Sequence, residues 1–579
     1  MKFNINSKFL GVFYVIILSA IYIPIYLNLY NLLVFLSPDG NIQQHLFLSA
    51  RKLVIESYVF LLFVFLLLKF RSVIRTVVES SFNIFVSKIT RIFNFKLSNS
   101  LKTFFSVLFF LYIIIASLII VFSMDVNSDE ATYLYTIKHY FEHGKFLYKS
   151  YYDMNIVHYD LLGQNLIAVL LKPITKYSIY LPRLITFGYS LGFVVLMFLY
   201  LKKTFSHNTA NMFLILCCSY PGFIYLSGTA FGENITLFYF FVSMYYLNRY
   251  ILKEEKKFLL FAGIAGALAL VTKMQFAFFF VLAMLVILIW YYIRAKEYKK
   301  LLWYLFYTFV FVAIIWVLYA ILQYNPQEIK KFLAKFYNFG SSSVSSSETF
   351  ITVLINIERF LGFQIVFLFA VVITGIKYWK REFLTSFIFI FIILNTLWYI
   401  FLKGHSFRFS YFVYMGIIYL AVLQITRALK ENGFKLKPFI ITFLILMFIS
   451  GFVQNFKLTR NGVGNNYQMY LTGNNPFTVY EAYEKNNDQK IFYEKVRTLI
   501  KPEEEIIFIG VENEIMLFLP NRFIWIDPND SDFSKYSGKF VVKPATNLQL
   551  NINTEYNNFL INYCNLIYKQ GLYELYKVK

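Results

Sequence analysis

The chain has 579 residues, of which 58% are hydrophobic and only 15% are charged, and this composition excludes a soluble enzyme. Apolar runs long enough to cross about 30 Å of hydrocarbon recur along most of it, so we expect a polytopic helical membrane protein. The net charge of +23 does not indicate nucleic-acid binding, because the basic residues lie largely in short loops between apolar runs, as positive-inside topology requires.

Hydropathy predicts an all-α membrane region of about 13 transmembrane helices. The first apolar run follows Lys2 and Lys8 and lacks a small-residue cleavage site, so we expect an uncleaved span rather than a signal peptide. The loop after the second span carries many Lys and Arg residues against a single acid, Glu79, and is predicted to be cytoplasmic. The predicted spans are 10–36, 53–70, 104–124, 180–201, 209–228, 234–251, 258–272, 276–293, 301–322, 360–376, 384–402, 408–426 and 438–454.

Three parts follow from this pattern. Residues 1–103 would hold two transmembrane helices and the basic cytoplasmic loop, and residues 104–454 a transmembrane core with outer loops at 125–179 and 323–358. From Asn455 the composition becomes polar, which indicates a small extracytoplasmic α/β domain over 455–579. Its expected strands are Glu505–Val511, Phe523–Ile526 and Phe540–Val542, and its expected helices are Ile491–Ile500 and Asn557–Tyr568.

The stretch after the third span brings two adjacent carboxylates to the outer interface. Ser128 is placed to cap a second helix, and Asp129 and Glu130 in its first turn oppose the positive end of its dipole. Apolar residues at three- and four-residue steps would let this helix lie flat on the bilayer until Gly144 ends it. The structural alternative is that the two acids serve only as capping groups, but carboxylates beside a bilayer are costly, which favours a function.

Further ionisable groups fall at the outer ends of spans. Glu233 opens the sixth span, Lys273 interrupts a long apolar stretch, and Arg183 and Arg408 flank other outer helix ends. The structural alternatives are an N-terminal helix acid for Glu233 and snorkelling cations for the other three.

A divalent metal is a further candidate ligand. His139 and His143 lie four residues apart, and Asp153 and His158 follow them. These residue types can ligate a metal, but an exposed helix face explains the histidine pair more simply, so we assign no metal ligand. No Walker loop or dinucleotide fingerprint occurs in the sequence.

The acids and cations are predicted to lie at the same depth, near the outer interface of the membrane. This arrangement would serve the transfer of a sugar from a lipid phosphate. A carboxylate can take a proton from an acceptor hydroxyl, while Lys and Arg stabilise the departing phosphate. A transporter or flippase of a lipid-linked glycan is the main alternative, for which we would expect an internal repeat and broken helices near the midplane. A noncatalytic membrane assembly protein would not need these charges to converge.

Six sequence elements occur in order on the same predicted side of the membrane. They are Ser128-Asp129-Glu130-Ala131-Thr132-Tyr133, Gly144 with Tyr151-Tyr152-Asp153, Pro182-Arg183-Leu184, Gly232-Glu233-Asn234, the segment from Gly263 to Lys273, and Arg408-Phe409. With them the chain resembles the polyprenyl-phosphate-sugar-dependent glycosyltransferases of the membrane C-type (GT-C) fold, near the protein mannosyltransferases and aminoarabinose transferases. The resemblance covers about residues 104–455.

The resemblance implies inverting sugar transfer at the outer face of the cell membrane, from a polyprenyl-phosphate donor to an acceptor hydroxyl. It implies catalytic roles for Asp129 (general base or metal-proximal acid), Glu130 and Glu233. Relatives carry a Lys-Pro-Pro-like element where this chain has Met154-Asn155-Ile156. Either the donor phosphate is bound by Lys273, Arg183 or Arg408, or the donor differs from that of the relatives. Residues expected near the substrate are Tyr133, Asp153 and His158.

Overall fold

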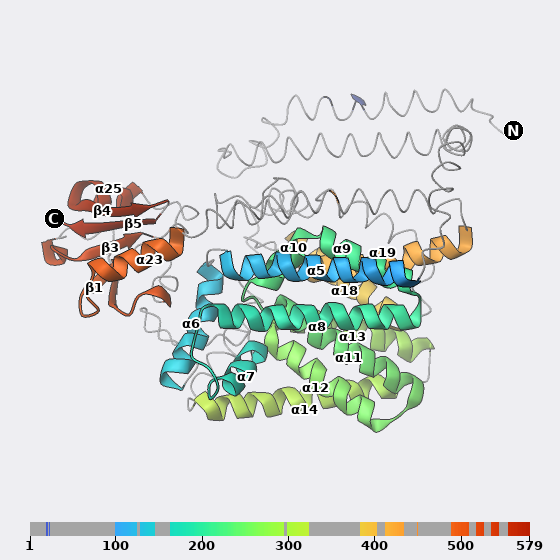
Figure 1. Ribbon diagram of the computed structural model, residues 1–579. Coiled ribbons are helices and arrows are strands. Elements are labelled where there is room, and N and C mark those ends of the chain that lie inside the picture. The colour runs from blue at the N-terminus through green and yellow to red at the C-terminus, as the bar shows by residue number, and fades with distance from the viewer. Residues whose placement is uncertain are drawn as a thin grey trace, which may run out of the picture.

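The computed structural model describes residues 19–20, 23, 99–123, 128–144, 162–294, 298–323, 383–401, 411–432, 449, 488–508, 517–525, 534–543, 554–571 and 573–579. These residues form a bundle of helices with a small sheet domain at one end (Figure 1). The predicted spans 10–36, 53–70, 360–376 and 438–454 fall almost wholly outside the described residues, as do the loop 323–358 and the predicted domain boundary at 454/455.

Eight described helices coincide with predicted spans. They are α5 (Asn99–Ser123), α8 (Tyr180–Thr204), α11 (Glu233–Lys253), α12 (Lys256–Thr272), α13 (Met274–Arg294), α14 (Tyr298–Gln323), α18 (Phe383–Phe401) and α19 (Tyr411–Asn432). By length and composition, two helical segments in the described part could cross a membrane, Ser100–Phe122 and Tyr180–Thr204. A bent pair of helices would make a third span.

That bent pair corrects the prediction of one straight span over 209–228. The segment is two helices, α9 (His207–Ser219) and α10 (Pro221–Gly228), with a bend of 77° between them. Tyr220 at the break has extended backbone angles, φ −99° and ψ 102°. A residue before proline disfavours the helical region, and the proline lacks the N–H that would continue the helix, so Pro221 starts a new one.

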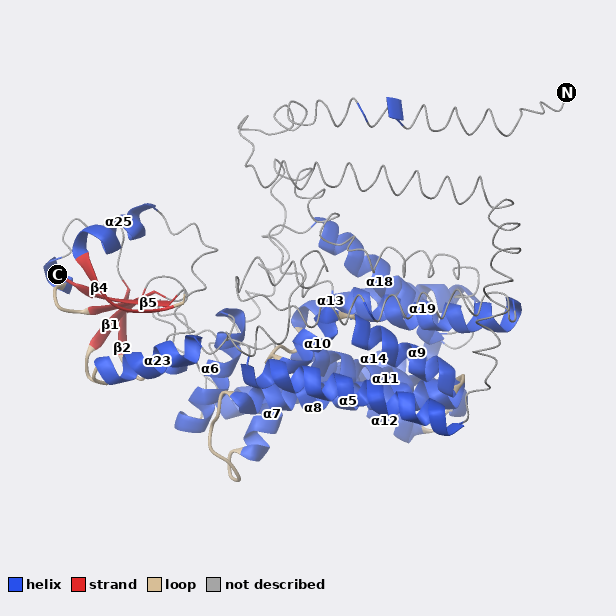
Figure 2. Ribbon diagram, turned by 45° about the horizontal axis from the view of Figure 1, so that its top comes forward, coloured by secondary structure: helices blue, strands red, loops and turns tan. Residues whose placement is uncertain are grey.

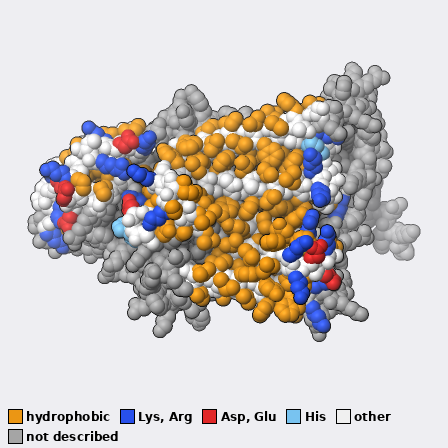
Figure 3. Space-filling model, turned by 60° about the horizontal axis from the view of Figure 1, so that its bottom comes forward, with side chains coloured by type: hydrophobic (Ala, Val, Ile, Leu, Met, Phe, Trp, Pro, Cys, Tyr) orange, Lys and Arg blue, Asp and Glu red, His pale blue; other side chains and the backbone are white. Residues whose placement is uncertain are grey.

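The surface of the bundle separates apolar and charged side chains. A broad apolar band covers the face shown in Figure 3, and Leu199, Phe261 and Phe306 are among the exposed apolar residues. Basic residues gather at the bundle end where α8 and α11 finish and α12 begins; they include Lys202, Lys203, Lys253, Lys256 and Lys257. An apolar belt ended by cations is typical of a protein surface in lipid.

Residues 488–579 include a mixed five-stranded sheet between two helices. The strand order is β2-β1-β3-β5-β4; β1, β2 and β3 are parallel, while β5 is antiparallel to β3 and β4. Helices α23 and α25 pack on opposite faces (Figure 2). The bounds are α23 Asp488–Leu499, β1 Glu505–Phe508, β2 Arg522–Trp525, β3 Phe540–Lys543, α25 Thr554–Tyr563, β4 Cys564–Gln570 and β5 Tyr573–Val578.

One helix predicted in this domain is too long. The predicted helix 557–568 ends at Tyr563, and the chain from Cys564 onward is strand β4. Strand β5, which the sequence analysis missed, follows a tight turn whose Gly571 has φ +59°. A short apolar run can satisfy helical and strand periodicity alike, and here pairing with β5 decides for the strand.

Helix α6 (Ser128–His143) is the outer helix that carries the two acids. Gly144 ends it as predicted: its φ is +74° and its N–H donates to the Tyr140 carbonyl at 2.8 Å. The expectation that its apolar face lies on the bilayer is wrong, because Tyr133, Leu134 and Ile137 are buried by the protein. Periodicity shows that a helix has an apolar face but does not show what covers it.

Candidate active site

The turn between α10 and α11, residues 229–232, lies between the charged residues singled out from the sequence. It begins after Gly228, where α10 crosses α5 so closely that an added Cβ would lie 2.4 Å from the Ile120 Cβ. Glycine is therefore required at this crossing. The turn lies at the bundle end nearest the sheet domain, away from the basic end.

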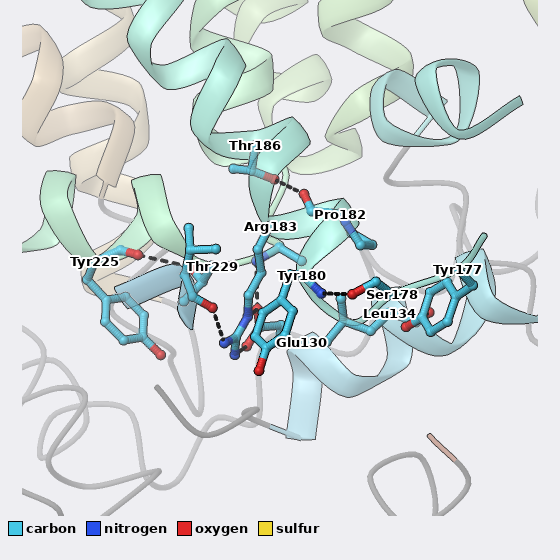
Figure 4. A network of polar contacts seen from close by, with 12 residues as sticks. Glu130, Leu134, Tyr177, Ser178, Tyr180, Pro182, Arg183, Thr186, Tyr225 and Thr229 are labelled. Carbon is cyan, nitrogen blue, oxygen red and sulfur yellow. Dashed lines mark hydrogen bonds and ion pairs between the residues drawn. The ribbon is translucent and has the colours of Figure 1, made fainter. Parts of the chain in front are cut away.

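Glu130 and Arg183 form a buried ion pair beside this turn (Figure 4). Arg183 Nε and Nη2 donate to Oε1 and Oε2 of Glu130, both at 2.8 Å, which is the bidentate geometry. Ala230 N also donates to Glu130 Oε1 at 2.7 Å, and Arg183 Nη1 donates to the Val121 carbonyl at 3.0 Å. The pair therefore joins α5, α6, α8 and the 229–232 turn.

Apolar contacts hold α6 against the same turn. The Tyr133 ring meets the Phe231 ring edge-on, with centroids 6.0 Å apart. Ala131 and Leu134 are fully buried in one cluster with Ala230. The start of α6, where Asp129 and Glu130 lie, is thus fixed to the turn by both charge and packing.

A second buried ion pair follows the turn. Lys273 Nζ lies 3.3 Å from Glu233 Oε1, and both side chains are at most 2% exposed. Glu233 is in the first turn of α11 and Lys273 is the C-cap of α12. An acid at a helix N-terminus and a cation at a C-terminus each oppose the local dipole charge, which stabilises both in place.

A hydrogen-bonded chain next to Glu233 was not predicted. The Tyr411 hydroxyl donates to Asn234 Oδ1, and Asn234 Nδ2 donates to Ser227 Oγ at 3.1 Å. The Tyr411 ring also stacks with Tyr220, at a centroid separation of 6.0 Å. Asn234 beside an acid at the start of an apolar helix was the available signal, whereas its partner Tyr411 lies 177 residues away.

The remaining predicted site residues are less fully described. Asp129 lies in the first turn of α6 beside Glu130, but its side chain is outside the described part, as are Asp153, His158 and Arg408 entirely. The His139 and His143 rings stack at 4.4 Å. Among the described residues, no group of three or more His, Cys, Asp or Glu side chains could hold a metal.

The geometry predicts that Arg183→Met is strongly destabilising. It leaves the Glu130 carboxylate buried without its guanidinium, which costs about 3–5 kcal/mol in folding free energy. The double variant Glu130→Gln with Arg183→Met should recover much of this loss, because no unpaired charge remains buried. Thermal unfolding of the purified protein in detergent measures both effects.

The matched control is Lys257→Met, which breaks an ion pair with Glu255 whose two side chains are 64% and 39% exposed. Pairs of this exposed kind contribute at most about 1 kcal/mol. A melting temperature of Arg183→Met equal to that of the control would contradict a structural role for the buried pair.

The chain is similar to known proteins in its sequence pattern and in its fold. Residues 164–319 match the family "Dolichyl-phosphate-mannose-protein mannosyltransferase". The fold is similar to that of ArnT from Cupriavidus metallidurans bound to undecaprenyl phosphate, with 12% identity, a TM-score of 0.57, and coverage of 82% of this chain and 98% of that chain. ArnT in the apo state gives a TM-score of 0.53 at the same identity and coverage. No curated protein sequence matches the chain.

The matched segment includes Arg183, Glu233 and Lys273, which are three of the four residues of the two buried ion pairs. The resemblance to the GT-C glycosyltransferases predicted from the sequence is therefore confirmed, by the mannosyltransferase family pattern over residues 164–319 and by the ArnT-like fold of the chain.

Proposed function

We propose that this protein is a membrane glycosyltransferase that moves a sugar from a polyprenyl-phosphate donor to an acceptor hydroxyl. The observation that carries the proposal is the buried Glu233–Lys273 pair at the end of the bundle away from the basic loops. The mannosyltransferase family match and the likeness to ArnT, whose structure holds undecaprenyl phosphate, support the donor class.

In this proposal Lys273 binds the phosphate of the donor. When the bond between the anomeric carbon and the phosphate oxygen breaks, the polyprenyl phosphate leaves with added negative charge. A buried ammonium stabilises that charge more strongly than a solvated one. Glu233, 3.3 Å from Lys273 Nζ, orients the ammonium in the absence of donor.

Asp129 is the proposed general base. It takes the proton of the acceptor hydroxyl as the acceptor oxygen bonds to the anomeric carbon from the face opposite the departing phosphate, so the configuration inverts. In support, the neighbouring residue Glu130 accepts a hydrogen bond from Ala230 N in the 229–232 turn, and Glu233 opens α11 directly after that turn.

We assign Glu130 and Arg183 an anchoring role instead of the catalytic and phosphate-binding roles expected from the sequence. Three N–H groups donate hydrogen bonds to the Glu130 carboxylate. The Arg183 guanidinium donates to that carboxylate and to the Val121 carbonyl. The carboxylate is thus engaged in joining α6 to α8 and to the 229–232 turn.

The site is proposed to face the extracytoplasmic side, because the basic residues gather at the opposite end of the bundle. A cysteine introduced at His143, an exposed residue at the end of α6, should react with a membrane-impermeant maleimide from outside intact cells. A cysteine at Lys257, at the basic end, should react only after the membrane is opened. The reverse labelling pattern would contradict this orientation.

Sugar transfer by the purified protein tests the function. The protein is incubated with a panel of radiolabelled polyprenyl-phosphate sugars and membrane acceptors, and labelled acceptor is counted. We expect transfer from at least one donor and none from nucleotide sugars. A parallel assay in proteoliposomes follows movement of the lipid-linked sugar across the bilayer; movement without transfer would favour the transporter alternative.

A further inference from the structure

Leu517 and Phe518, which lie in a helical turn just before β2 and are here called the domain latch, connect the sheet domain to the candidate active site. Leu517 is 4% exposed and is buried in one cluster with Ala131, Leu134 and Ala230. Ala131 and Leu134 belong to α6, and Ala230 belongs to the 229–232 turn. In both ribbon views α6 lies between the bundle and the sheet domain, beside α23 (Figures 1 and 2).

Polar contacts tie the latch from both sides. Lys138 Nζ, from α6, donates to the Leu517 carbonyl at 3.1 Å. Arg497 Nε, from α23, donates to the Phe518 carbonyl at 2.9 Å. Burial lowers the pKa of Lys138, and Arg497 lowers it further while Glu142 opposes the change; the ammonium is thus partly removed from water at this contact.

On the domain side, the latch packs on helix α23 and on the domain core. The Phe518 ring stacks on the Tyr493 ring of α23, with centroids 4.5 Å apart and planes 8° apart. Leu519, the next residue, is buried in the domain's own core with Phe492, Tyr493 and Val496. A movement of the sheet domain would therefore be transmitted to Leu517 and from there to α6.

Leu517 of the latch packs on residues that hold the start of α6, where Asp129 and Glu130 lie. Ala230, which Leu517 covers, donates its backbone N–H to Glu130 Oε1 at 2.7 Å. On the other side of the cluster, the Tyr177 hydroxyl donates to the Leu134 carbonyl at 3.1 Å. Leu517 thus closes the packing around the first two turns of α6, where Asp129 and Glu130 lie.

We propose that Leu517 is a positioning residue for sugar transfer: the sheet domain inserts it between α6 and the 229–232 turn and so fixes the proposed base Asp129 relative to the Glu233–Lys273 pair. This inference rests on the proposed function. It gives the sheet domain a part in the chemistry through Leu517, which acts on α6 and not on the reacting atoms.

Two leucines in the latch region make a matched comparison. Leu517→Ala removes the side chain packed on α6, whereas Leu519→Ala removes the same atoms from the domain core, where Leu519 is 2% exposed. We expect Leu517→Ala to lower kcat by about 10- to 100-fold, since a small misplacement of a reacting group has an effect of this size. The donor KM should stay near the parental value, because Lys273 lies outside the Leu517 cluster.

Leu519→Ala should lower the unfolding temperature of the domain and leave kcat near the parental value below that temperature. Leu517→Met keeps the volume and should restore most of the lost rate. Lys138→Met breaks the bond to the Leu517 carbonyl without touching the domain core and should lower kcat by about 2- to 10-fold, the range of one hydrogen bond. Parental kcat in both Leu517→Ala and Lys138→Met would overturn the proposal, as would equal kcat losses in the Leu517 and Leu519 variants.

A measurement independent of transfer separates this proposal from the proposed function. Hydrogen–deuterium exchange of the peptide spanning 128–143 should be faster in Leu517→Ala than in the parent and unchanged in Leu519→Ala. Unchanged exchange in Leu517→Ala overturns the latch whatever the activity. If the parent transfers no sugar while this exchange difference is present, the proposed function fails and the domain contact with α6 stands.

Discussion

Asp129→Asn is expected to abolish measurable sugar transfer while the protein is produced at the parental level and inserts into the membrane. The substitution keeps the shape of the side chain, and Asn serves near a helix N-terminus about as well as Asp. It removes the lone pair that would accept the acceptor's proton. Loss of a general base lowers kcat by roughly 10²- to 10⁴-fold, whereas loss of a charge near the helix dipole costs about 0.3–1 kcal/mol in stability.

The choice of control follows from the structure. Glu130→Gln, the neighbouring change, is unsuitable because it leaves the buried Arg183 guanidinium without its bidentate partner and should lower stability by itself. Glu142→Gln is better matched, since Glu142 is an exposed acid on the same helix. If Asp129→Asn and Glu142→Gln both transfer sugar at the parental rate, Asp129 is no base, and Glu233 becomes the acid to examine.

The sequence identifies four charged residues that the structure buries, but it does not predict their partners. Glu130, Arg183, Glu233 and Lys273 were identified because ionisable groups beside long apolar runs are unusual. Their pairing could not be deduced, since Glu130 and Arg183 are 53 residues apart and either cation could have faced either acid. Each buried charge requires an opposite charge or a hydrogen bond nearby, and the fold determines which partner it receives.

Helix α6 shows a second limit of sequence reasoning. Its apolar face and its end at Gly144 were read correctly from local spacing. A bilayer and a protein surface both cover an apolar face, however, and only the fold shows that Leu517, 383 residues after Leu134, lies on it. Contacts of such long range leave no periodic signal in the chain.

The Glu233–Lys273 pair carries the second large expected effect. Lys273→Met should lower kcat/KM for the donor by roughly 10²- to 10³-fold, the size seen when a group stabilising developing negative charge is removed. The variant also leaves the Glu233 carboxylate buried beside an apolar side chain, and this should reduce stability by about 3–5 kcal/mol. A loss of activity in the single variant could therefore come from either cause.

Removing both charges separates the two causes. Glu233→Gln with Lys273→Met leaves no unpaired buried charge, so its unfolding temperature should return toward the parental value, while donor use should stay low because the ammonium is still missing. Lys300→Met is the matched control: Lys300 pairs with Glu254 at the opposite end of α11, with Nζ and Oε1 2.6 Å apart, and should change transfer little. If the double variant is stable and transfers sugar at the parental rate, the pair only joins α11 to α12, and the phosphate must be bound elsewhere. If it is stable and inactive, the charged pair is required for the reaction itself, because the fold persists without it.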